Sequence, residues 1–325
     1  MGQKPRGTTK VKKANDKNLK GAGGGLKRRR FRLNQQKVAP YFFISPFYLL
    51  FGLFFLWPSF YAIFISFYRW NGIGEPRYFG WRNYERMFGD RVFWQAVENT
   101  ATYALASLFI VIPLALVIAV LLNAKTLRLA PIWRTMYITP IVTSTIAITL
   151  VFQILFNRDA GLINAPLIAL GLEPIYWLGD RFWVKISVII LIVWRSTGLL
   201  TVYFLAGLQS ISPTLYEAAS IDGATPFQQF RHITIPMLRP VILFVSVIVL
   251  LGSIQTFDEI YILFRGTGGP ANEALSLVQY LYQKGFTRLK LGFASAVGTI
   301  LFIATLVISL VQLRRFGVFQ SDTND

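Results

Sequence analysis

The chain has 325 residues, of which 54% are apolar and 15% are charged, and its formal net charge is +18. A typical soluble domain carries about 25% charged residues, so this composition argues against a soluble enzyme. The chain has no cysteine and a single histidine, His232. These counts exclude disulfides, thiolate metal sites, a catalytic triad and paired-histidine metal sites. We therefore expect no catalytic residue, no metal site and no cofactor.

The N-terminal segment 1–37 is strongly basic. It holds 13 of the 33 Lys and Arg residues and one acid, so it contributes +12 of the net charge. It has too little apolar surface to fold, which predicts a disordered cytoplasmic tail. A basic run alone is not a nucleic-acid recognition motif, and we expect no nucleic-acid partner.

Long uncharged segments follow this tail. Five of them, of 18 to 31 residues, contain no Asp, Glu, Lys or Arg: 38–68, 99–124, 135–157, 240–257 and 291–313. A helix needs about 20 apolar residues to cross a bilayer. With a further apolar segment that Arg195 interrupts, the sequence predicts an all-α integral membrane protein with six transmembrane helices, at about 41–67, 98–123, 135–157, 186–207, 236–263 and 291–313.

The distribution of Lys and Arg predicts the orientation of these spans. With the N-terminus inside, the cytoplasmic side carries 20 basic residues and the outer side 12. Without the tail the counts reverse to 7 and 12, so the prediction depends on the tail next to the first span. We predict a plasma (inner) membrane protein of bacterial type with both termini cytoplasmic, a six-helix domain at 38–318 and a short C-terminal tail at 319–325.

The connection between the fourth and fifth spans carries helix start and stop signals. Ser212-Pro213 and Thr225-Pro226 are each typical of a helix start, and Gly223 is typical of a helix end. Pro236 comes just beyond the expected second end. The pattern predicts two short helices, at about 213–221 and 226–233, joined by a tight turn. On these residues alone the hairpin could also merely close a loop.

This segment resembles the signature of the membrane subunits of binding-protein-dependent ABC importers. Glu217-Ala218-Ala219 is followed after three residues by Gly223, and after nine more by Ile233-Thr234-Ile235-Pro236. The departure from the family pattern is Ile235, where the family has Leu. Gly268-Gly269-Pro270 is similar to the carbohydrate branch of the family, whose members include the maltose-transporter-type permeases. The resemblance covers about 40–318.

The resemblance implies a division of labour between subunits. The hairpin would be a coupling helix seated on a cytoplasmic ATPase. The residues of this chain that match coupling positions are Glu217, Ala218, Ala219, Asp222, Gly223, Ala224, Pro226, Ile233 and Pro236. The chain lacks a phosphate-binding loop, so ATP hydrolysis is expected in a separate subunit. The implied partners are a second homologous permease, two ATPase subunits, an extracytoplasmic solute-binding protein, a sugar or polyol solute, and the bilayer.

The resemblance also implies solute contacts within the spans. By similarity to the maltose-type permeases these fall at Ile141, Thr145, Trp194, Arg195, Ser196, Leu251, Gln255 and Asp258. A charged residue within a span is costly, so Arg195 needs a water-filled cavity or a partner, for which Asp258 is one candidate. Gln255 and Asp258 are expected on one helix face. An ion pair that only locks helices remains an equal alternative, and a charged or amino-bearing solute remains open.

Two other functions are compatible with parts of the sequence. A proton-coupled secondary transporter would use Asp258 or Glu259. A membrane-anchored basic scaffold protein would act through 1–37. The paired cytoplasmic helices and the small number of spans favour the permease of an ATP-driven importer over a secondary transporter. Deletion of 1–37 would distinguish the scaffold protein, whose function it should abolish.

Overall fold

The computed structural model describes residues 35–124 and 128–315, and these fall into two compact units, Met1–Phe55 and Leu56–Asp325. The predicted tails lie outside the described residues, except that 35–37 already belong to the first helix. In the first unit, α1 (Gln35–Phe51) continues into a π-helical turn that starts at Gly52. Rings four residues apart stack along it, with centroids 6.0 Å apart for Phe47 and Phe51.

The second unit is helical apart from one two-residue ladder. Its elements, in chain order, are α2 Trp57–Ile65, β1 Tyr68–Arg69, β2 Arg77–Tyr78, α3 Arg82–Phe88, α4 Arg91–Ala106, the π turn η2 Ser107–Val111, α5 Ile112–Asn123, α6 Ala130–Val142, α7 Thr145–Leu155, α8 Ala165–Ala169, α9 Arg181–Gln209, α10 Pro213–Ile221, α11 Pro226–Gln229, the π turn η3 Phe230–Thr234, α12 Ile235–Met237, α13 Arg239–Ile254, α14 Asp258–Leu263, the 3₁₀ turn η4 Pro270–Asn272, α15 Leu277–Tyr282, the π turn η5 Gln283–Thr287 and α16 Leu291–Arg315. The strands β1 and β2 pair antiparallel, with Tyr68 opposite Tyr78.

Four helical segments of the described chain are long and apolar enough to cross a membrane: Pro40–Ile65, Arg91–Asn123, Arg181–Gln209 and Leu291–Arg314. Two bent helix pairs raise the number to six if each pair is one span: Pro131–Pro140 with Thr145–Leu155, and Pro226–Met237 with Arg239–Ile254. The six predicted spans correspond to the upper count, in which the two bent pairs overlap the predicted third and fifth spans.

Two spans begin earlier than the hydropathy pattern predicts, because an aspartate caps each. The carboxylate of Asp90 accepts a hydrogen bond from the Val92 N–H at 2.9 Å, and α4 begins at Arg91. Asp180 accepts one from Phe182 N–H at 2.9 Å and starts α9 in the same way. A side-chain acceptor satisfies N–H groups that have no partner in the first helical turn.

The predicted third span breaks between α6 and α7. Thr143 and Ser144 adopt extended ψ angles of 139° and 128°. The Thr143 hydroxyl donates to the carbonyl of Thr139 at 2.9 Å and satisfies an acceptor of the last turn of α6. Pro140, within α6, offers no N–H to the residue four before it. The Thr139 hydroxyl next to it donates to the carbonyl of Thr135 at 2.9 Å.

The predicted fifth span also differs from expectation. It is broken at Gln255–Phe257, after which α14 starts at Asp258. At its other end, Pro236 does not follow a helix end, because the helix continues through it to Met237. The π turn η3 bonds the Ile235 N–H to the carbonyl of Phe230, five residues back. This wider turn accommodates a proline that would interrupt a regular α-helix.

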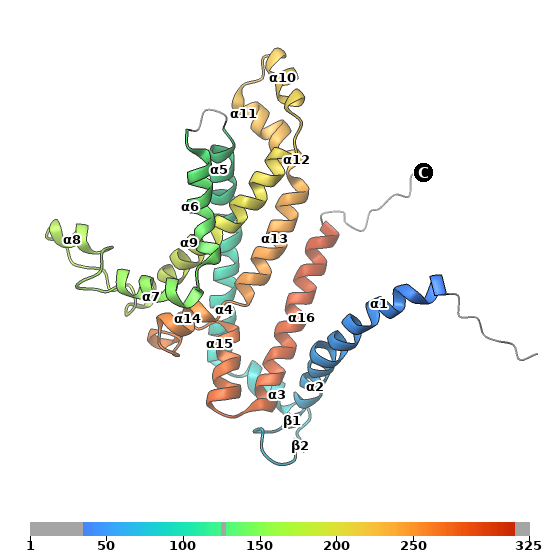
Figure 1. Ribbon diagram of the computed structural model, residues 1–325. Coiled ribbons are helices and arrows are strands. Elements are labelled where there is room, and N and C mark those ends of the chain that lie inside the picture. The colour runs from blue at the N-terminus through green and yellow to red at the C-terminus, as the bar shows by residue number, and fades with distance from the viewer. Residues whose placement is uncertain (1–34, 125–127, 316–325) are drawn as a thin grey trace, which may run out of the picture. The chain divides into compact units, whose positions relative to one another are not determined.

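Three buried clusters hold the second unit together. One joins α5, α9 and α13 around Phe204 and Val245; a second joins α7, α9 and α14 around Val188 and Ile260; a third joins α3, α4, α15 and α16 around Tyr280. Helix α9 contributes to the first two clusters. It therefore packs both against the helices next to the α10–α11 hairpin and against those on either side of the helix breaks. In Figure 1 the α10–α11 hairpin lies at one end of this unit and α3 with the two strands at the other.

Candidate functional site

The first candidate site is the α10–α11 hairpin. Helix α10 begins at Pro213, after Ser212, and ends at Ile221, as the sequence predicts. Gly223 has φ +79°, and the N–H groups of Gly223 and Ala224 donate to the carbonyls of Ser220 and Ala219 at 3.2 and 2.9 Å. This pattern is the Schellman helix end, which needs a left-handed residue at that position.

The second arm of the hairpin starts with a capping box. The Gln228 N–H donates to the Thr225 hydroxyl at 3.3 Å, and the Gln228 side-chain oxygen accepts from the Thr225 N–H at 2.7 Å. The predicted second helix at 226–233 is α11, which continues through η3 and α12 to Met237 and is therefore longer than predicted.

Side chains fix the hairpin to itself and to the spans. Gln229 Nε2 donates to the Ser220 hydroxyl at 2.9 Å across the turn. The hydroxyls of Tyr216 and Thr234 lie 2.9 Å apart and join α10 to η3. Tyr216, Phe230 and Ile233 pack against the cluster of α5, α9 and α13. The hairpin is therefore attached by side-chain contacts to the cluster of α5, α9 and α13.

The outer face of the hairpin exposes most of the predicted coupling residues. Glu217, Ala218, Asp222, Gly223 and Pro226 are exposed, whereas Ala219, Ala224, Ile233 and Pro236 are half-buried. Two apolar side chains outside the predicted set are also exposed on it, Ile221 at 87% and Phe227 at 69%. The apolar periodicity of the two helices is the signal that could have assigned them to this face.

The second candidate site is a polar cavity of about 290 Å³ among the helix breaks. Its polar lining comes from α6–α7, α9 and α13–α14: Thr143, Thr145, Arg195, Ser196, Ser253, Thr256 and Glu259, with Ser107 from η2. The breaks of the third and fifth spans both reach this cavity, and hydroxyl-bearing residues from both breaks line it.

Arg195 joins the three helices around the cavity. Its Nη1 donates to the Thr145 hydroxyl at 2.8 Å, and its Nη2 lies 3.0 Å from Oε1 of Glu259. The sequence named Asp258 as a candidate partner, and that assignment is wrong. Helix α14 starts at Asp258, so the break changes the register and directs Glu259 to Arg195.

The structure brings together some of the predicted solute residues and separates others. Thr145, Arg195 and Ser196 line the polar cavity. Trp194 lines a different pocket of about 820 Å³ between α6 and α9, and this pocket is almost wholly apolar. The Trp194 ring packs edge-on against the Phe152 ring, with 5.4 Å between the two ring centroids. The side chain of Ile141 lies outside the described set.

The predicted solute residues of the fifth span lie outside the cavity lining. Leu251 is half-buried, whereas Gln255 and Asp258 are exposed. Gln255 and Asp258 do not share a helix face, because the helix is interrupted between them. The solute assignment missed five polar residues of the cavity lining: Ser107, Thr143, Ser253, Thr256 and Glu259. The sequence considered Glu259 only for proton coupling.

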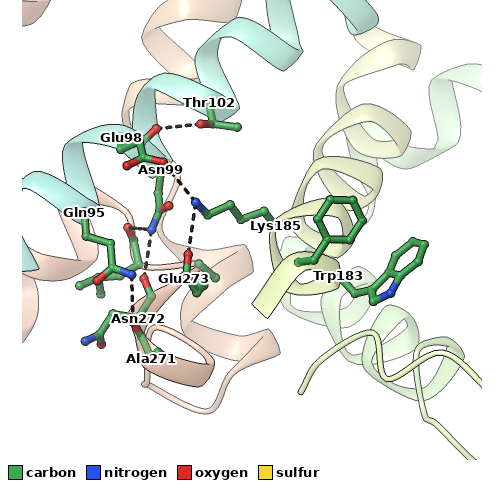
Figure 2. Close-up of polar contacts among 12 residues, drawn as sticks. Gln95, Glu98, Asn99, Thr102, Trp183, Lys185, Ala271, Asn272 and Glu273 are labelled. Atoms are coloured by element: carbon green, nitrogen blue, oxygen red, sulfur yellow. Dashed lines mark hydrogen bonds and ion pairs between the residues drawn. The ribbon is translucent and has the colours of Figure 1, made fainter. Parts of the chain in front are cut away.

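The loop with Gly268-Gly269-Pro270 is fixed to two spans at the end away from the hairpin (Figure 2). Asn99 Nδ2 donates to the carbonyls of Asn272 and Leu275 at 3.0 and 3.1 Å, and Gln95 donates to that of Ala271 at 2.9 Å. Lys185 on α9 lies 3.2 Å from Glu273 and 3.5 Å from Glu98. The motif therefore belongs to a loop that α4 and α9 hold in place.

The long apolar helices define a helical membrane protein, and comparison with known proteins identifies its family. Residues 112–316 match the family described as binding-protein-dependent transport system inner membrane component. The chain belongs to this family, which confirms the resemblance seen in the hairpin motif.

Relatives and solved structures match over most of the chain. The lactose transport system permease protein LacF of Rhizobium radiobacter is 38% identical over 85% of this chain and 93% of its own. The arabinooligosaccharides permease protein AraP of Bacillus subtilis is 37% identical over 88% of this chain and 91% of its own. A subunit of a bacterial ABC transporter that imports the acidic polysaccharide alginate has the same fold, with a TM-score of 0.76, 24% identity, and coverage of 87% of this chain and 96% of its own.

Proposed function

We propose that this chain is the transmembrane permease subunit of an ATP-driven importer for sugars or related polyols and forms half of its translocation pathway. The observation that carries the proposal is the exposed hairpin face with Glu217, Ala218 and Gly223, held to α9 and α13 by Tyr216 and its neighbours. The named functions of the relatives, lactose and arabinooligosaccharide transport, support the solute class.

In this proposal the hairpin faces the cytoplasm and couples the spans to an ATPase subunit. The contact residues are those that match the family motif, together with Ile221 and Phe227, whose exposed apolar surface suits burial in a partner. Nucleotide binding can shift the spans only if the ATPase has different affinities for the nucleotide in the two transport states. The anchoring of the hairpin to three spans provides the mechanical connection.

The assembly would contain a second homologous permease, two ATPase subunits and an extracytoplasmic solute-binding protein. Both termini would be cytoplasmic. The solute would contact Thr145, Arg195 and Ser196 in the polar cavity, with Gln255 and Asp258 at its edge. Hydroxyl and charged groups in a small cavity suit the many hydroxyls of a sugar ring, which both donate and accept hydrogen bonds.

Reconstitution with the partner subunits tests this function. We expect proteoliposomes with the complete assembly to accumulate radiolabelled disaccharide only with ATP inside and binding protein outside. Omitting the ATPase subunits should abolish uptake. Uptake by this chain alone, driven by a proton gradient, would instead support the secondary-transporter alternative, and the cavity contacts would then need a new interpretation.

The orientation has its own test. A single cysteine introduced at Ser220 into the cysteine-free chain should react with a membrane-impermeant maleimide only after the inner face is opened. Labelling from outside intact cells would place the hairpin on the wrong side for an ATPase and would rule out the coupling role.

A further inference from the structure

The polar cavity contains one positive and one negative side chain. Among the described residues that line it, Arg195 and Glu259 are the charged ones, and their charges cancel. The exposed Asp258 is not among the lining residues. The cavity therefore presents hydroxyls and an internally neutralised ion pair rather than a net charge.

The two members of this ion pair differ in access. The Glu259 side chain is 5% exposed, whereas that of Arg195 is 38% exposed. Glu259 is therefore the more buried member of the pair, and Arg195, which also lines the cavity, keeps part of its side chain exposed. A guanidinium has five N–H donors, and the bonds to Thr145 and Glu259 use two of its nitrogens.

An arginine without a counterion would favour an anionic solute. Guanidinium and carboxylate groups form strong, charge-assisted bonds, often in bidentate geometry. Glu259 already occupies the Nη2 side of the guanidinium, and its negative charge opposes a second carboxylate nearby. An uncharged sugar hydroxyl can still accept a bond from the exposed part of Arg195 without that repulsion.

We propose that Glu259 is a specificity-determining residue that neutralises Arg195 and so makes the cavity select uncharged sugar rings over rings that carry a carboxylate. This inference rests on the proposed sugar-import function and names the charge class of its solute. Glu259 lines the cavity but is almost fully buried, and it acts through the charge of Arg195. The cavity volume of about 290 Å³ is at the lower end of ligand sites, which suits a single ring.

The matched probes are methyl glucoside and methyl glucuronide, which differ in one group, a hydroxymethyl against a carboxylate. Their affinities are measured by isothermal titration on the two permeases with the two ATPase subunits in nanodiscs, without the solute-binding protein. For the unaltered protein we expect at least tenfold tighter binding of the glucoside. In Glu259→Gln the carboxamide keeps the shape of the side chain but not its charge. We expect the ratio of glucoside affinity to glucuronide affinity to shift at least tenfold towards the glucuronide.

Two further variants separate this role from general damage. Arg195→Gln/Glu259→Gln should lose the gained glucuronide affinity, because the unpaired guanidinium is then absent. Glu273→Gln removes a carboxylate from another ion pair, with Lys185 outside the cavity, and should leave the ratio unchanged. An unchanged ratio in Glu259→Gln, or an equal shift in Glu273→Gln, would overturn the proposal.

A readout without solute tests the neutralisation of Arg195 separately from the sugar-import function. Phenylglyoxal modifies free guanidinium groups, and mass spectrometry can follow its reaction at Arg195. We expect labelling several-fold faster in Glu259→Gln than in the unaltered protein. Equal rates would refute neutralisation by Glu259 even if sugars are imported. If neither probe binds any variant while the rates differ, the sugar-import function fails and the ion pair stands.

Discussion

Gly198 on α9 lies against the backbone carbonyl of Tyr137 on α6, so closely that a methyl group at Gly198 would overlap the carbonyl oxygen. This contact brings α6 next to α9 beside the break at Thr143. The spacing of the two helices, and with it the position of Thr145 relative to Arg195, depends on the missing side chain.

We expect Gly198→Ala to destabilise the protein. Forcing extra atoms into a packed interface costs about 1–3 kcal/mol, which exceeds the roughly 1 kcal/mol that alanine gains over glycine within a helix. Gly252→Ala is the matched control, because a methyl there meets nothing within 4 Å. Thermal unfolding in detergent should show a lower midpoint for Gly198→Ala and an equal or higher one for Gly252→Ala. Equal midpoints would contradict the contact.

Gly223→Pro is expected to separate ATP hydrolysis from uptake. Proline requires φ near −65°, whereas Gly223 has φ +79°, and proline also removes the N–H that bonds the Ser220 carbonyl. The turn of the hairpin should therefore rearrange while the spans still insert. In proteoliposomes we expect uptake to fall at least tenfold and ATP hydrolysis to become independent of the binding protein.

Gly171→Pro controls for damage to a turn in general. Gly171 also has a positive φ, +73°, and its N–H bonds the Ile168 carbonyl, but it follows α8, away from the hairpin. We expect this variant to retain coupled uptake. If both variants transport normally, the assignment of the hairpin to coupling is wrong.

The hairpin could be predicted from the sequence because its signals are local. Pro213 at the first helical position and Gly223 at the Schellman position each fix the backbone where they stand, and α10 begins and ends at the predicted residues. The membership of the family could also be predicted, since the Glu217 motif has a fixed spacing.

The helix breaks could not be predicted in the same way. An apolar segment satisfies the hydropathy criterion whether its helix is straight or interrupted, and Thr143 or Gln255 reads as an ordinary polar residue within a span. The partner of Arg195 was misassigned for this reason. Periodicity in an unbroken helix gives no basis for preferring Glu259, and only the new start of α14 directs it towards Arg195.

The stability of the end away from the hairpin should depend on pH through Asp90. Its carboxylate accepts bonds from Lys284 Nζ at 2.8 Å and from the Tyr280 hydroxyl at 2.7 Å. Burial alone would raise the pKa of Asp90, but these bonds and the one from the Val92 N–H outweigh it and leave the pKa below its usual 3.8. Such a group stabilises the fold above its unfolded pKa, and this contribution disappears as the pH falls through the folded value.

We therefore expect the unfolding midpoint of the unaltered protein to fall by a few degrees more between pH 6 and pH 3 than that of Asp90→Asn, which cannot lose a charge there. Lys284→Met should also reduce the pH dependence, because the strongest donor is gone. Parallel curves for the three proteins would show that Asp90 does not contribute to acid sensitivity.

Uptake by variants at Gln255 and Asp258 tests whether the solute pathway extends from the polar cavity to the break between α13 and α14. It is exposed and stands between Ser253 and Thr256, which both line the cavity. Removing one hydrogen bond to solute costs about 0.5–1.5 kcal/mol, which corresponds to roughly a two- to thirteenfold loss of affinity. We expect Gln255→Ala to raise the KM of uptake by about this factor, and Asp258→Ala to change KM or the preference among sugars. Gln95→Ala, which removes a half-buried amide of α4 outside the cavity lining, is the control and should leave uptake unchanged. Wild-type kinetics in both Gln255→Ala and Asp258→Ala would confine the solute contacts to Thr145, Arg195 and Ser196. A loss of the assembled protein from the membrane would instead show that the break between α13 and α14 is needed for folding rather than for solute binding.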